Sequence, residues 1–285
     1  MPTRRIYPGY DIPGYHERLS KSIKRYGLPR RAPRAWLHDV DFEAFDYLGY
    51  MQPSGAMYWQ CYLFAALQAV GIDQRPELST ITILDQRWHF GERKWNFAPG
   101  KIEYQVRRAL KGLNFIVAIE FETFRNVRYL GPAPPGSVAA HQDQGRTIAP
   151  HIQGLIWGKR PSPSQRAQFA GGLFGAPPIE VVGVYDFPGA QRYLGKPPYK
   201  GRSVYQRLDG TFGRRPWLKM SLTLHHLFLA NLHRYCWPEL TFASGEGSAI
   251  LTEAKRLWRD YKPGSTHPTD YRPPLYSGLV KRVRR

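Results

Sequence analysis

Cysteine and acidic residues are both scarce in this chain of 285 residues, which has two cysteines and 22 Asp and Glu residues. Cys61 and Cys236 lie far apart, which excludes a disulfide framework or a cysteine cluster for metal and predicts a reducing, cytoplasmic setting. The most apolar run, residues 57–72, is interrupted by Gln60 and Gln68 and is shorter than a comfortable membrane span, so we expect a core helix there. The first residues lack the apolar stretch of a signal peptide. We therefore expect no membrane partner.

Basic residues, by contrast, are abundant. The chain has 41 Lys and Arg residues and a formal net charge of +19, while hydrophobic residues make up 42% and aromatic residues 14%. That hydrophobic content predicts a buried core, in one large domain or two modest ones. An excess of positive charge indicates a polyanionic partner, most commonly nucleic acid. An anionic membrane surface is the weaker alternative, because no long basic amphipathic helix is evident.

The positive charge is concentrated in separate blocks. Residues 1–35 contain nine basic and two acidic side chains, whereas residues 36–100 contain four basic and eight acidic ones. Residues 190–220 contain eight basic side chains and one acidic one, and the tail from Arg272 adds five basic residues. A solvated surface usually scatters both signs of charge, so these blocks indicate basic arms and a patch that contact phosphate.

Residue patterns predict a fold of the α+β class. Strands are expected at 80–84, 115–121, 151–157 and 179–185, and helices at 42–72, 101–113, 164–174, 221–237 and 250–261. The order β-α-β-β-α-β, at the centre of the chain, is typical of a ferredoxin-like or split β-α-β antiparallel sheet with helices on one face. We divide the chain into a basic flexible arm (1–35), a helical extension (36–77), a sheet domain (78–216) and a helical C-terminal region with a basic tail (217–285).

Two predicted strands carry side chains with metal-binding chemistry. His151 and Gln153 are one residue apart and therefore point to the same face of their strand, and the same spacing relates Glu120 and Glu122 on the preceding strand. If the two strands pair antiparallel, an imidazole, an amide oxygen and a carboxylate meet, which suits Mg²⁺ or Mn²⁺. The alternative is a structural histidine beside surface glutamates.

A second motif lies within the basic block at 190–220. Tyr193 is followed by Lys196 one helical turn later. A tyrosine hydroxyl, with an ordinary pKa of about 10, is a poor nucleophile unless a metal and a nearby cation assist it. The alternative is a surface tyrosine followed by a lysine that binds phosphate.

Together these motifs resemble those of the HUH endonucleases, in particular the rolling-circle replication initiators. The run from Pro150 to Gly154, Pro-His-Ile-Gln-Gly, is similar to the His-hydrophobic-Gln variant of their second motif, and Gly-Arg-Thr precedes it at 145–147. Tyr193 to Lys196 is similar to their Tyr-x-x-Lys motif, and the strand at 80–84 is the best candidate for their first motif. The resemblance covers about residues 78–200, which makes 78–216 an HUH-like nicking domain.

This resemblance implies a site and a mechanism. His151, Gln153 and an acidic residue would hold Mg²⁺ or Mn²⁺ at the scissile phosphate. Tyr193 would attack that phosphate and leave a 5′-phosphotyrosine link and a free 3′-hydroxyl. The position of the acidic ligand in many members favours Glu120 over Glu122, whereas the circovirus-like members point to Asp143.

The sequence also departs from the viral members of that family. No G-x-x-x-x-G-K-[ST] motif occurs, so no P-loop helicase is expected. About 77 residues precede the first motif, and the C-terminal helices are similar to none of that family's. The architecture is closer to a plasmid or phage initiator, by analogy.

The expected partners are single-stranded DNA at a replication origin and host replication proteins. The side chains expected to contact the DNA are Arg192, Lys200, Arg202, Arg214 and Arg215. Two other functions stay open: a non-catalytic basic protein that binds nucleic acid, and a relaxase or transposase with the same chemistry.

Overall fold

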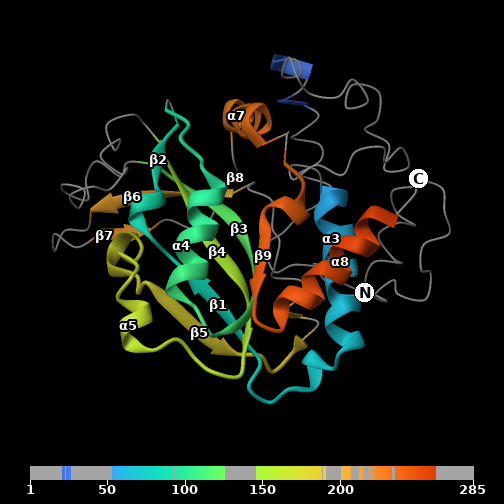
Figure 1. The fold of residues 1–285 in the computed structure, drawn as a ribbon. Coiled ribbons are helices and arrows are strands. Elements are labelled where there is room, and N and C mark those ends of the chain that lie inside the picture. The colour runs from blue at the N-terminus through green and yellow to red at the C-terminus, as the bar shows by residue number, and fades with distance from the viewer. Residues whose placement is uncertain are drawn as a thin grey trace, which may run out of the picture.

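A computed structural model of the chain gives an α+β fold in which helices pack around one mixed, curled β-sheet (Figure 1). The structure describes residues 21–22, 24–26, 53–92, 94–125, 146–187, 189–190, 200–206, 212–214, 218–219, 221–232 and 235–260.

Helices and strands of very different lengths follow one another along these residues. The α-helices are α3 (Pro53–Ala69), α4 (Pro99–Ala109), α5 (Pro163–Arg166), α7 (Leu222–Leu232) and α8 (Gly247–Asp260). The strands are β1 (Ser79–Ile83), β2 (Phe90–Gly91), β3 (Asn114–Arg125), β4 (Arg146–Trp157), β5 (Ile179–Gly183), β6 (Lys200–Gln206), β7 (Phe212–Arg214), β8 (Leu218–Lys219) and β9 (Thr241–Ser244). Single 3₁₀ turns form at Ile72–Gln74, Gln86–Trp88, Leu173–Gly175 and Trp237–Glu239.

The strands β3 and β4 form the centre of the sheet. Each has 12 residues, and they pair antiparallel over their whole length, from Asn114 opposite Trp157 to Arg125 opposite Arg146. β1 and β2 pair with the other edge of β4, and β9 and β6 pair with the other edge of β3. Both central strands thus have neighbours along their edges, and consecutive residues of each strand are buried, which shows that both faces of the sheet are covered here.

The expectation of a wholly antiparallel sheet was wrong in one place. β6 runs parallel to β3, with Phe124 opposite Arg202, and continues the order β5-β1-β4-β3-β6-β7. The chain leaves the sheet at β5 on one edge and returns beside β3 on the other. The region 188–216 has many Gly, Pro and basic residues, so its sequence predicted no strand there.

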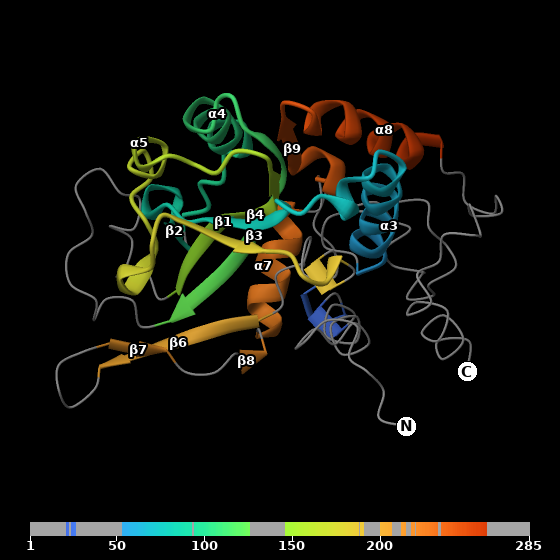
Figure 2. The ribbon, with the colours of Figure 1, turned by 90° about the horizontal axis from the view of Figure 1, so that it is seen from below.

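The helices α4 and α5 lie on the same side of the sheet (Figure 2). Pro99 begins α4, where its missing N–H is not needed, and the buried residues Ile102, Val106 and Ala109 share one face of that helix. Phe97, just before the helix, makes an edge-to-face contact with Phe121 of β3 at 4.9 Å. This side of the sheet is therefore closed by apolar packing.

The helices α3 and α8 pack against each other beyond β9. Trp59 of α3 lies edge-on to Trp258 of α8, with 5.8 Å between the ring centroids, and donates a hydrogen bond to Thr241 of β9 at 3.0 Å. Of the helix predicted at 42–72, residues 42–52 lie outside the described residues, and the apolar part forms the core helix α3, which ends at Ala69 and in which Leu67 is 1% exposed. Within the ranges described above, no helix is both long and apolar enough to cross a membrane.

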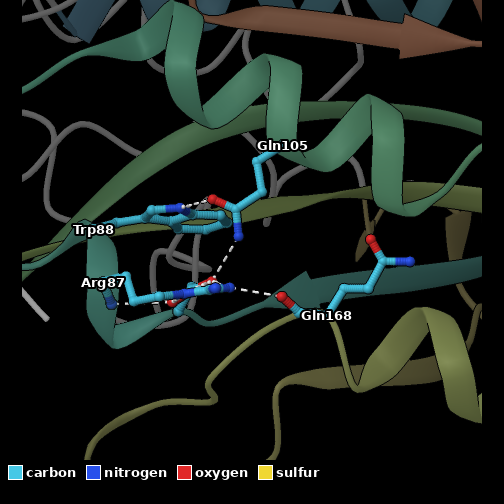
Figure 3. A network of polar contacts seen from close by, with 5 residues as sticks. Arg87, Trp88, Gln105 and Gln168 are labelled. Carbon is cyan, nitrogen blue, oxygen red and sulfur yellow. Dashed lines mark hydrogen bonds and ion pairs between the residues drawn. The ribbon is translucent and has the colours of Figure 1, made fainter. Parts of the chain in front are cut away.

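A polar network attaches the end of β1 to α4 (Figure 3). Asp85 is fully buried and pairs with Arg87, whose guanidinium also donates to the Gln168 carbonyl at 2.6 Å. Gln105 of α4 donates to the Asp85 carboxylate and accepts from the Trp88 indole, both at 2.9 Å. The buried charge is paired and hydrogen-bonded, which is the condition for its burial to be tolerated.

Two predicted helices are shorter than expected. The helix predicted at 164–174 ends at Arg166, and the rest of the predicted range contains Gly171 and Gly175, whose positive φ angles (78° and 68°) are incompatible with a continuous helix. The helix predicted at 221–237 has its described part from Leu222 to Leu232, and Pro238 lies in a separate 3₁₀ turn.

The described residues near the two ends of the chain contain regular structure. Residues 21–22 and 24–26 are helical, and Ser22 and Tyr26 hydrogen-bond to Leu222 and Thr223 of α7 at 3.0 and 2.9 Å. The C-terminal region adds the strands β8 and β9 to the sheet as well as α7 and α8.

Candidate functional site

The two faces of the β3–β4 pair differ in chemistry. Glu120 lies directly opposite His151 in the register, and Ala118 lies directly opposite Gln153. Since alternate residues share a face, Glu120, Glu122, His151 and Gln153 all lie on one side, which we call the polar face. The other side carries Ile119, Phe121 and Ile152 and is called the apolar face; the helix α4 packs against it.

The closest contact on the polar face joins His151 and Glu120. The His151 Nε2 atom is 3.7 Å from a Glu120 carboxylate oxygen, and the two side chains are 11% and 4% exposed. Antiparallel neighbours directly opposite one another have Cβ atoms about 5 Å apart, close enough for the two groups to interact. The pair is held by two central strands and not by loops, which makes its geometry rigid.

Gln153 lies one row further along the same face. It stands between Ala118 of β3 and Thr82 of β1 in the register, and it is 6% exposed. The predicted trio of His151, Gln153 and Glu120 is thus brought to one face, although no single pair of residues in the sequence specified which glutamate would lie opposite the histidine.

Glu122, the alternative acidic residue, lies one row away in the other direction. It is opposite Ala149, and its carboxylate is 3.9 Å from the Arg202 guanidinium, with side-chain exposures of 28% and 21%. The parallel pairing of β6 with β3 places Arg202 there. A cation predicted to contact DNA therefore lies at the end of the polar face.

The glycine that follows Gln153 has a steric role. A Cβ atom on Gly154 would lie 2.2 Å from the Ile116 carbonyl oxygen and 2.5 Å from the Val117 Cα atom of β3. Only glycine permits this close approach of the two strands. In the Gln-Gly pair, Gln153 thus supplies a side chain on the polar face, and Gly154 allows the backbones of β3 and β4 to lie close together.

His89 is a residue that sequence reasoning missed. It is 3% exposed, and in the described part of the chain its Nδ1 atom makes no hydrogen bond. The pKa of His89 is lowered to about 4, mainly by burial, with Asp85 opposing the shift and His151 adding to it. The imidazole is therefore neutral near pH 7. A lone histidine before a two-residue strand has no periodicity that could have revealed it.

The donor types of the polar face are ones that can bind a divalent cation. Two donor atoms each about 2.1 Å from one cation lie about 3.0 Å apart in neighbouring octahedral positions and about 3.4 Å apart in tetrahedral ones, so the His151–Glu120 separation of 3.7 Å would have to shorten slightly for both to bind one ion. An amide oxygen from Gln153 belongs to the same chemical class of ligands. Among the residues that the structure describes, however, no three His, Cys, Asp or Glu side chains form a group that could hold a metal ion.

Several predicted site residues lie outside the described residues: Asp143, Arg192, Tyr193, Lys196 and Arg215. Lys200 and Arg214 fall in β6 and β7, whose backbone is described. The last described residues before Tyr193 are Phe187, Gly189 and Ala190, which are helical. Phe187 stacks on Phe64 of α3, with 4.9 Å between the ring centroids.

Comparisons with known proteins give no relative from which the function of this site could be inferred. The chain matches no protein-family model, no curated protein and no solved structure. The polar face is therefore the feature of the molecule from which a function can be inferred.

Proposed function

We propose that the protein is a metal-dependent endonuclease that nicks and rejoins single-stranded DNA to start rolling-circle replication. The observation that carries the proposal is the polar face, where His151, Gln153 and Glu120 are buried together on the two central strands. Burying an imidazole, an amide and a carboxylate side by side costs free energy, and a shared function explains why the cost is tolerated.

The strand order supports this proposal. Within the larger sheet, β5, β1, β4 and β3 are adjacent and antiparallel in that order. α4 connects β1 to β3 with β4 inserted between them, which is a split β-α-β unit, and α5 connects β4 to β5. We propose that these elements form a ferredoxin-like unit, extended by β6 to β9.

In this proposal the cation is Mg²⁺ or Mn²⁺, held by His151, Glu120 and the amide oxygen of Gln153. When bound, it supplies a Lewis acid that polarises the scissile phosphate. Glu122 and Asp143 are the alternative acidic ligands. The 3.9 Å contact of Glu122 with Arg202 favours Glu120, because a carboxylate paired with a guanidinium is less available to a metal.

Tyr193 is the proposed nucleophile. Its phenol oxygen forms a bond to phosphorus as the bond from phosphorus to the 3′-oxygen breaks, and the proton lost by the phenol balances the one gained by the 3′-oxygen. The products are a 5′-phosphotyrosine and a free 3′-hydroxyl. The ammonium group of Lys196 would stabilise the charge that develops on the phosphate and the phenolate.

The basic residues Arg192, Lys200, Arg202, Arg214 and Arg215 would hold the DNA backbone near this site. Single-stranded DNA at an origin and host replication proteins are the proposed partners, in a cytoplasmic setting. The chain's net charge of +19 supports a nucleic-acid partner.

The experiment that tests the proposal incubates the protein with labelled single-stranded origin DNA and Mn²⁺ and looks for a covalent adduct on a denaturing gel. Tyr193→Phe is expected to abolish the adduct, and Tyr185→Phe, at a side chain that is 99% exposed, is the matched control. Adduct formation by Tyr193→Phe would show that another residue is the nucleophile. Glu120→Gln is expected to lose Mn²⁺-dependent adduct formation, and Glu122→Gln is expected to retain it.

A second candidate function is a basic protein that binds nucleic acid without catalysis. It is favoured by the lack, within the described ranges, of three His, Cys, Asp or Glu side chains grouped for a metal. Such a protein would bind DNA with a steep salt dependence and form no adduct with any metal.

A further inference from the structure

We propose that the protein has a second nucleic-acid contact surface, a basic ridge on the opposite side of the sheet from the polar face. The ridge consists of Lys101, Tyr104 and Arg108 of α4, Lys111 after that helix, and Lys159 and Arg160 after β4. The identity of its partner, single-stranded DNA, rests on the proposed function. The ridge would hold the DNA that flanks the proposed nicking site. A strand that is bound at the polar face can reach the ridge by passing around the sheet.

The first part of the ridge follows from the amphipathic character of α4. Lys101, Tyr104 and Arg108 are spaced by three and four residues and are all exposed, while Ile102 and Val106 between them are buried. Arg107 points back toward the sheet: its guanidinium lies 5.7 Å from the Phe242 ring centroid and donates to the Ala243 carbonyl. One stripe of the helix is thus left outside the core.

The second part of the ridge comes from two adjacent turns. Because Asn114 pairs with Trp157, the turn that precedes β3 and the turn that follows β4 lie side by side. Gln165 of α5, in the segment that follows this second turn, donates a hydrogen bond to the Lys111 carbonyl at 3.3 Å and attaches that segment to the first turn. Lys111 is therefore a neighbour of the turn that carries Lys159 and Arg160, and all three residues are exposed.

Interactions within the folded chain account for only part of the charge of the ridge. In the described part of the chain, none of its five cations makes an ion pair, whereas Arg107 is paired with Glu103 at 2.8 Å. Cations in the last turn of a helix are stabilised by the helix dipole, which accounts for Arg108. Lys101, in the first turn, opposes the dipole, and Lys159 lies outside the helix. Like charges gathered in this way repel unless a polyanion binds them.

Tyr104 indicates a single-stranded partner. Its side chain is 65% exposed, and the Arg108 guanidinium lies over its ring at 5.7 Å from the centroid. An exposed aromatic ring among cations is a platform on which an unpaired base can stack while its phosphates contact the cations. A base within a duplex has no free face for such a contact.

The first test compares two variants with the same change in charge. Lys159→Glu/Arg160→Glu alters the ridge, and the control Lys94→Glu/Arg259→Glu alters two exposed cations elsewhere. Binding of a fluorescent 40-nucleotide oligo(dT) is measured by anisotropy across a salt series. We expect the ridge variant to lose at least about tenfold in affinity at 0.1 M salt and about 1.4 in the salt slope, since each phosphate contact in single strands contributes about 0.7.

The second test removes the stacking platform without changing the charge. Tyr104→Ala is expected to weaken oligo(dT) binding by about fivefold or more, and Tyr104→Phe to leave it unchanged, because the ring is retained. Thermal melting shows whether each variant is folded. These residues are exposed, so their substitution leaves the core intact.

Three outcomes would overturn the ridge. Equal loss in both charge variants would show that net charge alone matters, and no loss in either would show that DNA does not contact Lys159 and Arg160. Loss of binding by Tyr104→Phe as large as by Tyr104→Ala would exclude stacking. Failure of the unaltered protein to bind DNA would overturn the proposed function itself, and is thus distinguishable from failure of the ridge.

Discussion

The polar and apolar faces of the β3–β4 pair are built from alternate residues of the same two strands. On the apolar face, Ile119 and Ile152 are 1% and 0% exposed, and on the polar face Glu120 and His151 are 3% and 9% exposed. Burial is thus similar, but only the apolar face gains free energy from it. The polar residues are therefore present at a cost to stability, which is the usual condition of a functional site.

The largest expected effect separates the two faces directly. Ile152→Ala removes a fully buried side chain of the apolar face and should lower the free energy of unfolding by about 3 to 4 kcal/mol. Gln153→Ala, at the adjacent position on the polar face, should cost about 1 kcal/mol or less, because loss of its packing is offset by the removal of a buried amide. Urea denaturation measures both. Equal losses would show that the polar face contributes to stability as the apolar face does.

The contact between the strands gives the next largest effect. Gly154→Ala should destabilise the protein by about 2 to 3 kcal/mol, because its Cβ would meet the β3 backbone at 2.2 Å. Gly100→Ala is the matched control: no atom lies within 4 Å of its Cβ position, and alanine favours the helix that contains it. Thermal unfolding should show a lower midpoint for the first variant only. An unchanged midpoint in Gly154→Ala would mean that β3 and β4 can separate locally.

Because the imidazole of His89 is buried in its neutral form, the free energy of unfolding depends on pH. Its pKa is lowered from 6.5 to about 4, so the unfolded chain takes up a proton at a higher pH than the folded one. The contribution of neutral His89 to the free energy of unfolding is therefore fully present above pH 6.5 and is lost as the pH falls toward 4. Between pH 7 and pH 5 this loss is about 2 kcal/mol.

The measurement for His89 is urea unfolding at pH 7 and pH 5. In His89→Leu this contribution to the pH dependence should be absent, so the variant loses less stability on acidification. Identical losses in the variant and the unaltered protein would assign the pH dependence to other groups.

The smallest effect is expected where the polar face reaches solvent. Glu122→Gln removes the attraction to Arg202 across 3.9 Å, and both side chains are partly exposed. Such pairs contribute about 0 to 1 kcal/mol, so the change in unfolding free energy should be near the limit of measurement. A loss above about 2 kcal/mol would show that this pair is part of the buried structure.

Much of the sheet could be predicted because its signals are local. The β-branched alternation at 80–84, the apolar run at 115–121 and the one at 151–157 all became strands, and Pro99 marks the start of α4. β9 was not predicted: it has only four residues, and its pairing partner Phe115 lies more than a hundred residues away. A segment this short has no period of its own to detect.

The candidate site was predictable in composition but not in arrangement. The spacing of His151 and Gln153 placed both side chains on one face, since the side-chain period of a strand is two. The choice between Glu120 and Glu122 depended on the strand register, which a shift of two residues would have reversed. His89 and Arg202 reach the same end of the sheet only through the pairing of β2 with β4 and of β6 with β3.

Composition and local periodicity were enough to establish the class of the fold, the excess of positive charge and which side chains share a face within one strand. Tertiary pairing was needed to establish which strands are neighbours, that Glu120 lies opposite His151, and that the turn after α4 lies beside the turn carrying Lys159 and Arg160. The physical reason is that hydrogen-bonded pairing and core packing join residues far apart in the chain, and no local pattern specifies those partners.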